Sequence, residues 1–196
     1  MQKPKSDKHS DLIGCQYQIS VLRDNFVPMI LSALGKVNTD KVWAVTEKTS
    51  TTYRGKAIHV VDCVKACFSH IYDDTLPYIT MTATFFKTGD DDFSKDCRIA
   101  EDDIPANNVK KSFHVLGRMS LFPLGLTNYE NHTAAVIDFA RKRNISVTKN
   151  RYATGFDGNV NDMFDLINDI LAYGNENIDN YALNMSITIY GAEAIA

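Results

Sequence analysis

The feature that most constrains how this chain can fold is an internal repeat. The stretch TSTTYRGKAIHVVD at residues 49–62 is echoed by YATGFDGNVNDMFD at 152–165, and the two align without a gap when the numbering is shifted by 103. The pairs matched at this shift are Val42 with Ile145, Thr51 with Thr154, Tyr53 with Phe156, Gly55 with Gly158, and Asp62 with Asp165. Such a repeat indicates two copies of one folding unit.

Each copy has the pattern of a strand, a helix, two strands, a helix and a strand. Tyr17, Ile19 and Val21 alternate with polar residues, as in a half-buried strand. Asp24 is the expected N-cap of the helix that follows. The other elements expected in the first copy are a helix over 25–36, a hairpin over 41–54, a helix over 56–72 and a strand over 78–86. Those expected in the second copy are a strand near 115–122, a helix near 129–142, a hairpin near 145–156, a helix near 159–173 and a strand near 181–190.

The second helix of each copy has an apolar face at helical spacing. In the first copy this face comprises Ala57, Val60, Val61, Val64, Phe68 and Ile71. In the second copy it comprises Val160, Met163, Phe164, Ile167 and Leu171. Both helices are therefore expected to pack against their sheets.

The order βαββαβ is that of the ferredoxin-like unit. The sequence therefore predicts an α+β fold, a tandem repeat of two such units, each an antiparallel four-stranded sheet with its helices on one face. The other face can meet water, and its outward residues would include Gln16, Gln18, Ser20, Thr80, Thr82 and Thr84. The two units can pack open face to open face, or each can find a partner subunit. We expect a homodimer, because small two-layer units often need more burial than they supply alone.

The expected boundaries are a flexible N-terminus at 1–14, a first repeat at 15–88, an acidic linker at 89–112 and a second repeat at 113–191. The linker carries clustered carboxylates, which could bind a divalent ion. It lacks the spacing and central Gly of an EF-hand loop, so we interpret it as a solvated connecting arm.

Composition narrows the setting of the protein. Hydrophobic content of 44% and charge of 23% are those of an ordinary globular chain. No apolar run approaches the roughly 20 residues that span a bilayer, and the N-terminus lacks the apolar core of a signal peptide. We therefore expect a cytoplasmic protein with reduced cysteines. The net charge of -3 and the lack of a basic stripe argue against a nucleic-acid partner.

The sequence contains no GxSxG, HExxH, P-loop or Rossmann motif. The strongest metal candidate is the set His59, Cys63, Cys67 and His70 on one predicted helix. Its outer members are about 16 Å apart at 1.5 Å per residue, whereas zinc ligands lie about 2.0–2.3 Å from the metal. We expect no metal, no cofactor and no catalytic residue, with Cys63 and Cys67 acting as small hydrophobes beside the core.

The corner between the hairpin and the second helix of each copy is the best candidate site. Its polar residues are Ser50, Thr51 and Arg54 in the first copy, and Thr154 and Asp157 in the second. Hydroxyls both donate and accept, so they can bind a heteroaromatic ring with amine and ring-nitrogen groups. Trp43, Tyr53 and Phe156 would offer stacking surfaces that also suit a cation. Threonines selected for their β propensity explain the corner equally well.

Several motifs match those of a known family in order and spacing. They are KVWAVTEKTSTTYRG followed by HVVDCVKA, RYATGFDG followed by DMFD, DNF opening the first helix, and FPL ending the first strand of the second copy. On these motifs the chain resembles the YkoF family of thiamin- and hydroxymethylpyrimidine-binding proteins from about Gly14 to Gly191. The resemblance implies a homodimer of tandem ferredoxin-like repeats, with one ligand pocket per repeat and no catalysis. It also implies ligand contacts at Ser50, Thr51 and Arg54 in the first copy, and at Thr154 and Asp157 in the second.

The sequence departs from the family pattern at one point. The family ends the first strand of each half with an aromatic-Pro pair, which the second copy keeps as Phe122-Pro123. The first copy has Ser20-Val21 instead. If that aromatic lines the pocket, the first site has lost it or has changed specificity.

These observations predict a non-catalytic binder of thiamin or its hydroxymethylpyrimidine moiety that supports uptake or salvage of the vitamin, with a functional link to a membrane transporter. The hydroxyl-lined pocket is expected on the uncovered side of each sheet. Because Arg54 and Asp157 carry opposite charges, the two sites would differ in affinity. Two alternatives remain: a regulatory or adaptor module that recognises another protein, and an enzyme acting on a pyrimidine precursor.

Overall fold

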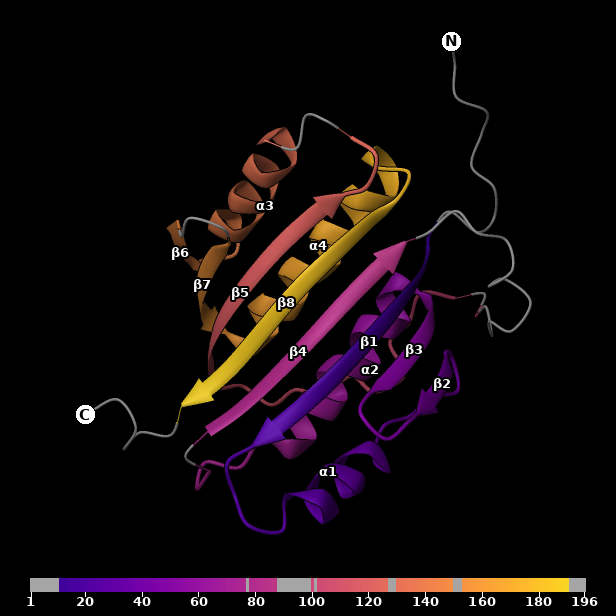
Figure 1. The fold of residues 1–196 in the computed structure, drawn as a ribbon, viewed down its shortest axis with the longest axis vertical. Helices are drawn as coiled ribbons and strands as arrows, with labels where there is room; N and C mark the ends of the chain where they lie inside the picture. The colour runs from indigo at the N-terminus through magenta and orange to yellow at the C-terminus, as the bar shows by residue number, and fades with distance from the viewer. Residues whose placement is uncertain are drawn as a thin grey trace.

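The computed structural model describes residues 11–76, 78–87, 100, 102–126, 130–149 and 153–190. Two βαββαβ units follow one another along the chain (Figure 1). The first comprises β1 (Leu12–Val21), α1 (Phe26–Leu34), β2 (Trp43–Thr46), β3 (Thr51–Lys56), α2 (Ala57–Ile71) and β4 (Tyr78–Lys87). The second comprises β5 (His114–Pro123), α3 (Glu130–Lys142), β6 (Ser146–Lys149), β7 (Thr154–Asn159), α4 (Val160–Asn177) and β8 (Tyr181–Tyr190). The predicted α+β tandem of ferredoxin-like units is confirmed.

The two four-stranded sheets join edge to edge into one eight-stranded antiparallel sheet. Its strand order is β2-β3-β1-β4-β8-β5-β7-β6. Corresponding strands of the two units therefore occur in the same order from the outer edge to the centre. The joint is the β4–β8 pair, whose register runs from Tyr78 opposite Tyr190 to Lys87 opposite Tyr181. The units therefore lie side by side, an arrangement different from the open-face packing considered from the sequence.

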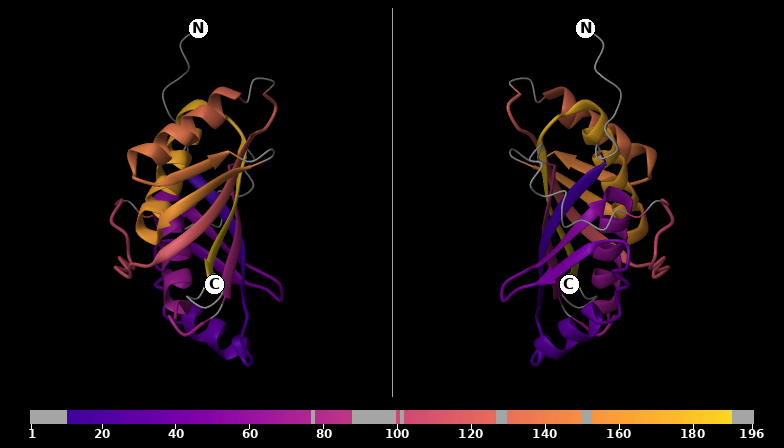
Figure 2. Two further views of the ribbon diagram at one scale, coloured as in Figure 1. Left: turned by 90° about the vertical axis from the view of Figure 1, so that its left-hand side faces the viewer. Right: turned by 90° about the vertical axis from the view of Figure 1, so that its right-hand side faces the viewer.

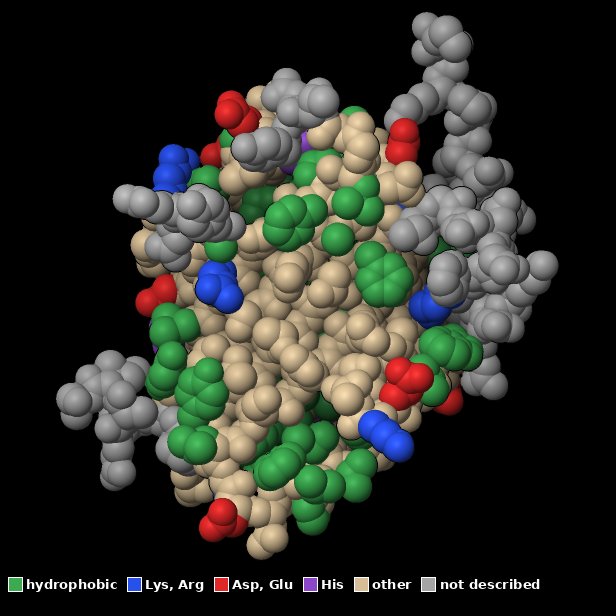
Figure 3. All heavy atoms as spheres, viewed as in Figure 1, with side chains coloured by type: hydrophobic (Ala, Val, Ile, Leu, Met, Phe, Trp, Pro, Cys, Tyr) green, Lys and Arg blue, Asp and Glu red, His purple; other side chains and the backbone are tan. Residues whose placement is uncertain are grey.

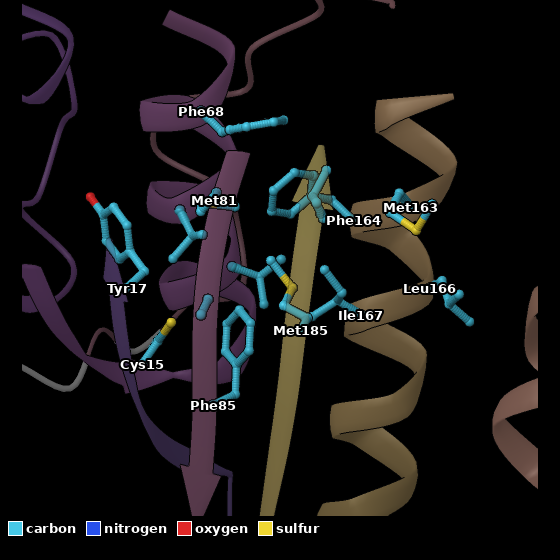
Figure 4. Packing of buried hydrophobic residues seen from close by; sticks show 14 of the residues in the cluster. Cys15, Tyr17, Phe68, Met81, Phe85, Met163, Phe164, Leu166, Ile167 and Met185 are labelled. Atoms are coloured by element: carbon cyan, nitrogen blue, oxygen red, sulfur yellow. The ribbon is translucent and has the colours of Figure 1, made fainter. Parts of the chain in front are cut away.

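The helices lie on one side of this sheet (Figure 2). The apolar faces predicted for the second helix of each copy are confirmed, since all their members are buried except Ala57, which packs against the core half-exposed. Helices α2 and α4 also contact each other, and the rings of Phe68 and Phe164 lie 6.4 Å apart between centroids (Figure 4). One apolar core thus runs through both repeats. No helix among the described residues is both long and apolar enough to cross a membrane.

The opposite face of the sheet is open, as predicted. Gln16, Gln18, Ser20 and Thr82 are exposed, and Thr80 and Thr84 are half-buried. Figure 3 views this face: its middle is mostly uncharged polar side chains and backbone, and charged groups gather mainly towards its rim.

The repeated glycines have a packing role in the hairpin corner. A Cβ atom at Gly55 would lie 3.3 Å from the Lys41 carbonyl oxygen, and one at Gly158 would lie 3.3 Å from a side-chain carbon of Ile145. In each repeat, the segment that leads into the outermost strand therefore crosses close to the end of its neighbour. The repeated glycine therefore reflects the same close approach of two neighbouring segments in both repeats.

Two predicted helix ends are wrong. The N-cap of α1 is Asn25, not Asp24; its backbone is left-handed, with φ of 59°, and no side chain caps the helix. Helix α4 continues to Asn177, beyond the predicted end near 173. Gly174 lies against Tyr181, where a Cβ would be 2.8 Å from a ring carbon. This glycine allows the helix to approach β8 and does not end it.

The described end of the acidic linker is tied to the first repeat. The Asp62 carboxylate of α2 accepts hydrogen bonds from the Asn107 amide, at 2.9 Å, and from its side chain, at 2.8 Å. Asp102 and Asp103 form ion pairs with Lys41 and Lys56. These carboxylates have lysine partners. Residues 89–99 and 101 of the predicted linker lie outside the described residues. Strand β1 begins at Leu12, inside the segment expected as a flexible N-terminus.

The shared core predicts that the two repeats unfold together. Phe164→Ala removes a buried ring from the second repeat and should cost about 3–5 kcal/mol. Trp43, the single tryptophan, lies in the first repeat. Its fluorescence should therefore report the same lowered midpoint as far-UV circular dichroism. The matched surface change Leu124→Ala should have little effect, since Leu124 is 50% exposed. A tryptophan transition that stays at the wild-type midpoint would contradict the single core.

Candidate functional site

A hollow of about 240 Å³ lies on the helix side of the first repeat, between α1, β1 and the β2–β3 hairpin. We call it the covered-face hollow. Its helix wall consists of Phe26, Val27, Ile30, Leu31 and Leu34. Its hairpin wall consists of Thr46, Glu47, Lys48, Thr49, Ser50 and Thr51. Its floor is formed by Tyr17, Gln18 and Ile19 of β1 and by Cys67 of α2.

The hollow exists because α1 is short and loosely packed. Of its nine residues, only Ala33 is fully buried. Phe26, Val27 and Leu31 are 45%, 51% and 58% exposed, although all three are large and apolar. Apolar side chains that line a concavity are the usual wall of a small-molecule site. This helix therefore offers apolar surface to a ligand instead of placing it in the core.

The hairpin supplies the polar side of the hollow. Thr51 is nearly buried, and its hydroxyl oxygen lies 3.1 Å from that of Thr46 on the neighbouring strand. Ser50 accepts a hydrogen bond of 3.2 Å from the side chain of Gln16. The Glu47 amide donates to the Ser50 carbonyl at 2.9 Å, which closes the turn. Among the described residues that line the hollow, Glu47 is the one carboxylate and Lys48 is the one cation.

The structure brings only some of the predicted site residues together. Ser50 and Thr51 line the covered-face hollow, but Arg54 does not. Side chains alternate along a strand, so residues three apart point to opposite faces. Burial along β3 follows this alternation, and Thr51 shares the helix-facing side with Tyr53. The prediction that the hydroxyl-lined pocket lies on the uncovered side is therefore wrong for Thr51.

The second repeat shows the same division. Thr154 is 8% exposed and lies on the buried side of β7. Asp157 is exposed and forms an ion pair with His114, with 3.2 Å between Nε2 and Oδ1. Residues 127–129 and 150–152, which correspond to the rim of the hollow, lie outside the described residues.

The predicted stacking surfaces do not form this site. Tyr53 and Phe156 are each 2% exposed and belong to the core. Trp43 lies across from Arg54 on the outermost strand and does not line the hollow. Phe26 and Tyr17 supply the aromatic surface instead. The run FVPMIL, which has too many apolar residues for one helix face, is the sequence signal that could have identified Phe26.

Each repeat also has a hollow on the open face. The first is about 230 Å³ and is lined mainly by Gln16, Gln18, Thr49, Ser50, Thr82 and Thr84. The second is about 320 Å³ and is lined mainly by Arg118, Ser120, Phe122, Asn184 and Ser186. Phe122 therefore faces the open side, so Ser20 at the matching position removes no aromatic ring from the covered-face hollow. The first open-face hollow is lined mostly by polar residues, with Tyr17 and Ala83 as its apolar members, which makes it a weaker candidate than the covered-face hollow.

The thiols near the covered-face hollow are suited to packing and not to nucleophilic chemistry. Cys63 and Cys67 are 2% and 0% exposed, which confirms their predicted place in the core. Burial is the main cause that raises the pKa of Cys63 to about 12 and that of Cys67 to about 11. Both therefore remain neutral thiols near pH 7, whereas the thiolate is the reactive form.

Comparison with known proteins agrees with this architecture. The protein named "Putative HMP/thiamine-binding protein YkoF" from Bacillus subtilis (strain 168) is 26% identical to this chain over 186 residues, covering 91% of this chain and 90% of that protein. The profile of the YKOF-related family matches residues 12–88 and 114–191, the two segments that form the βαββαβ units. This chain belongs to the YKOF-related family.

Proposed function

We propose that the protein binds thiamin or its hydroxymethylpyrimidine moiety in the covered-face hollow, without catalysis. The observation that carries the proposal is the meeting of an apolar helix wall, a row of hairpin hydroxyls and one carboxylate in a single small hollow. The name of the Bacillus subtilis relative supports the same ligand class.

The two rings of thiamin have different needs that this hollow can meet. A pyrimidine is flat and carries an amine and ring nitrogens, which suit the hydroxyls of Thr46, Ser50 and Thr51. Its faces suit the apolar side chains of α1. The thiazolium ring is cationic, and a cation is stabilised by an aromatic face such as Phe26 and by the Glu47 carboxylate.

The proposal extends to one pocket in each repeat, with Thr154 as the second-repeat contact. Thr154 supports it, because it occupies the same register position as Thr51: Thr51 lies opposite Tyr17, and Thr154 lies opposite Met119. Arg54 and Asp157 are not proposed as contacts in these pockets, because they lie on the other face of the sheet. The expected difference in affinity must then come from other residues.

We further propose that binding serves uptake or salvage of the vitamin in the cytoplasm, in functional association with a membrane transporter, and that the protein is a homodimer. The open face supports a second copy as its occupant, because its middle is nearly free of charge (Figure 3). Depletion of charged residues is a mark of interface centres.

The first test compares two neighbouring threonines. Thr51→Val removes a hydroxyl from the hollow and should weaken hydroxymethylpyrimidine binding about tenfold, the effect of one lost hydrogen bond. Thr52→Val alters the next residue, which lies on the other face, and should leave affinity unchanged. Isothermal titration calorimetry measures both. Equal effects of the two substitutions would place the ligand elsewhere, and no heat with the wild-type protein would refute the proposed function.

A second test uses the charge of the ligand. Glu47→Gln removes the carboxylate but keeps the size of the side chain. It should weaken binding of thiamin, which is cationic, several-fold at low salt and leave the neutral pyrimidine moiety unaffected. Lys48→Gln is the matched control, and it should not weaken thiamin binding. Equal loss for both ligands in Glu47→Gln would show that the carboxylate does not face the thiazolium ring.

The homodimer is tested by sedimentation. Wild-type protein should sediment at twice the 22.0 kDa mass of the chain. Thr82→Arg places a charge in the middle of the open face and should shift the protein towards the monomer. Asp138→Arg, on the exposed side of α3, is the control and should remain dimeric. A dimer that tolerates Thr82→Arg would exclude the open face as the interface.

A further inference from the structure

A buried group of polar side chains extends from the core to the floor of the covered-face hollow. The Tyr17 hydroxyl donates a hydrogen bond of 3.0 Å to the hydroxyl oxygen of Tyr53. The Cys67 thiol lies close enough to contribute, after burial, to the raised pKa of the Tyr17 phenol. All three residues are at most 3% exposed, yet Tyr17 and Cys67 line the hollow. Tyr17 and Cys67 therefore border the space that a ligand would fill.

The second repeat shows that the fold does not require this chain. Met119 occupies the register position of Tyr17, because each lies opposite the matching threonine. At the shift of 103, Phe156 replaces Tyr53 and Ile170 replaces Cys67. All three replacements are buried and apolar. The same framework is therefore stable with an apolar floor, so the polar floor of the first repeat needs a separate explanation.

The direction of the hydrogen bonds determines what the floor can recognise. A phenol oxygen has one proton to donate and two lone pairs to accept with. Tyr17 gives its proton to Tyr53, so towards the hollow it can only accept. Burial raises the pKa of Tyr17 well above its usual value, so the phenol stays protonated near neutral pH. The floor thus favours a ligand that donates a hydrogen bond.

We propose that Tyr17 is the specificity-determining residue of the first-repeat pocket, and that it accepts a hydrogen bond from an amine on a six-membered nitrogen heteroaromatic ring. Tyr53 is a positioning residue, because it holds the Tyr17 proton away from the ligand. The second-repeat floor, with Met119, Phe156 and Ile170, cannot make this distinction. The inference rests on the proposed function and adds the group that selects the ligand.

The test measures the binding of three pyrimidines that differ at one position. The probes are 4-amino-5-hydroxymethyl-2-methylpyrimidine, the same compound without the amine, and the same compound with a 4-oxo group. Tyr17→Phe should weaken binding of the amine probe about tenfold, and binding of the compound without the amine less than about twofold. Tyr53→Phe frees the Tyr17 proton and should shift preference from the amine towards the 4-oxo compound. Met119→Leu, the matched change in the second repeat, should leave the first-site preference unchanged.

The outcomes separate the two claims. If wild-type protein binds none of the three probes, the proposed function fails and the inference fails with it. If wild-type protein binds but Tyr17→Phe weakens the amine and its deaminated analogue equally, or neither, the inference alone fails. Thermal unfolding of each variant confirms that it is folded. Tyr53→Phe tests the claim independently, since damage to packing would not reverse the preference between amine and 4-oxo probes.

Discussion

The antiparallel ladder between β4 and β8 is the interaction on which the rest of the structure depends. Each βαββαβ unit alone would end in an exposed edge strand, and such edges promote unwanted pairing. Here the last strand of each unit covers the edge of the other, from Tyr78 opposite Tyr190 to Lys87 opposite Tyr181. The same contact brings α2 and α4 together, so that two small cores become one. Burial that neither unit could supply alone is obtained within one chain.

Because the core is shared, side chains that do not contribute to the β4–β8 joint can differ between the two repeats. Cys63 and Cys67 of α2 correspond to the larger Leu166 and Ile170 of α4. Cys67 lies in the floor of the covered-face hollow, where a small side chain leaves room. The corresponding aspartates of the two repeats also have different interaction partners. Asp62 holds the linker through Asn107, whereas Asp165 lies 3.4 Å from Arg143 at the end of α3.

The fold class could be predicted from the sequence because the spacing of apolar residues along a helix or strand shows which side chains are buried. The apolar faces of α2 and α4 and the alternating strands were predicted, and the repeat doubled the evidence for each element. The edge-to-edge joint could not be predicted, because the sequence pattern of an apolar strand is the same whether its edge is exposed to water or paired with another strand. The sequence predicted that the last helix ends near 173, but α4 continues past Gly174, whose small size allows contact with Tyr181.

The candidate site was predicted in part. Ser50 and Thr51 lie in one hollow, but Arg54 points away, because a spacing of three along a strand changes the face. The aromatic residues nearest in sequence, Tyr53 and Phe156, are buried in the core. The aromatic wall comes from α1, which is distant in sequence. Only the folded arrangement shows that Phe26 lines the same hollow as these hydroxyl-bearing residues.

The most direct measurement is a crystal structure of the protein soaked with thiamin. The account predicts density for a flat ring between α1 and the β2–β3 hairpin, within hydrogen-bond distance of Thr51 and Ser50, with Phe26 against it. Density confined to the open face beside Thr82 and Thr84, with the space beneath α1 unchanged, would contradict the account.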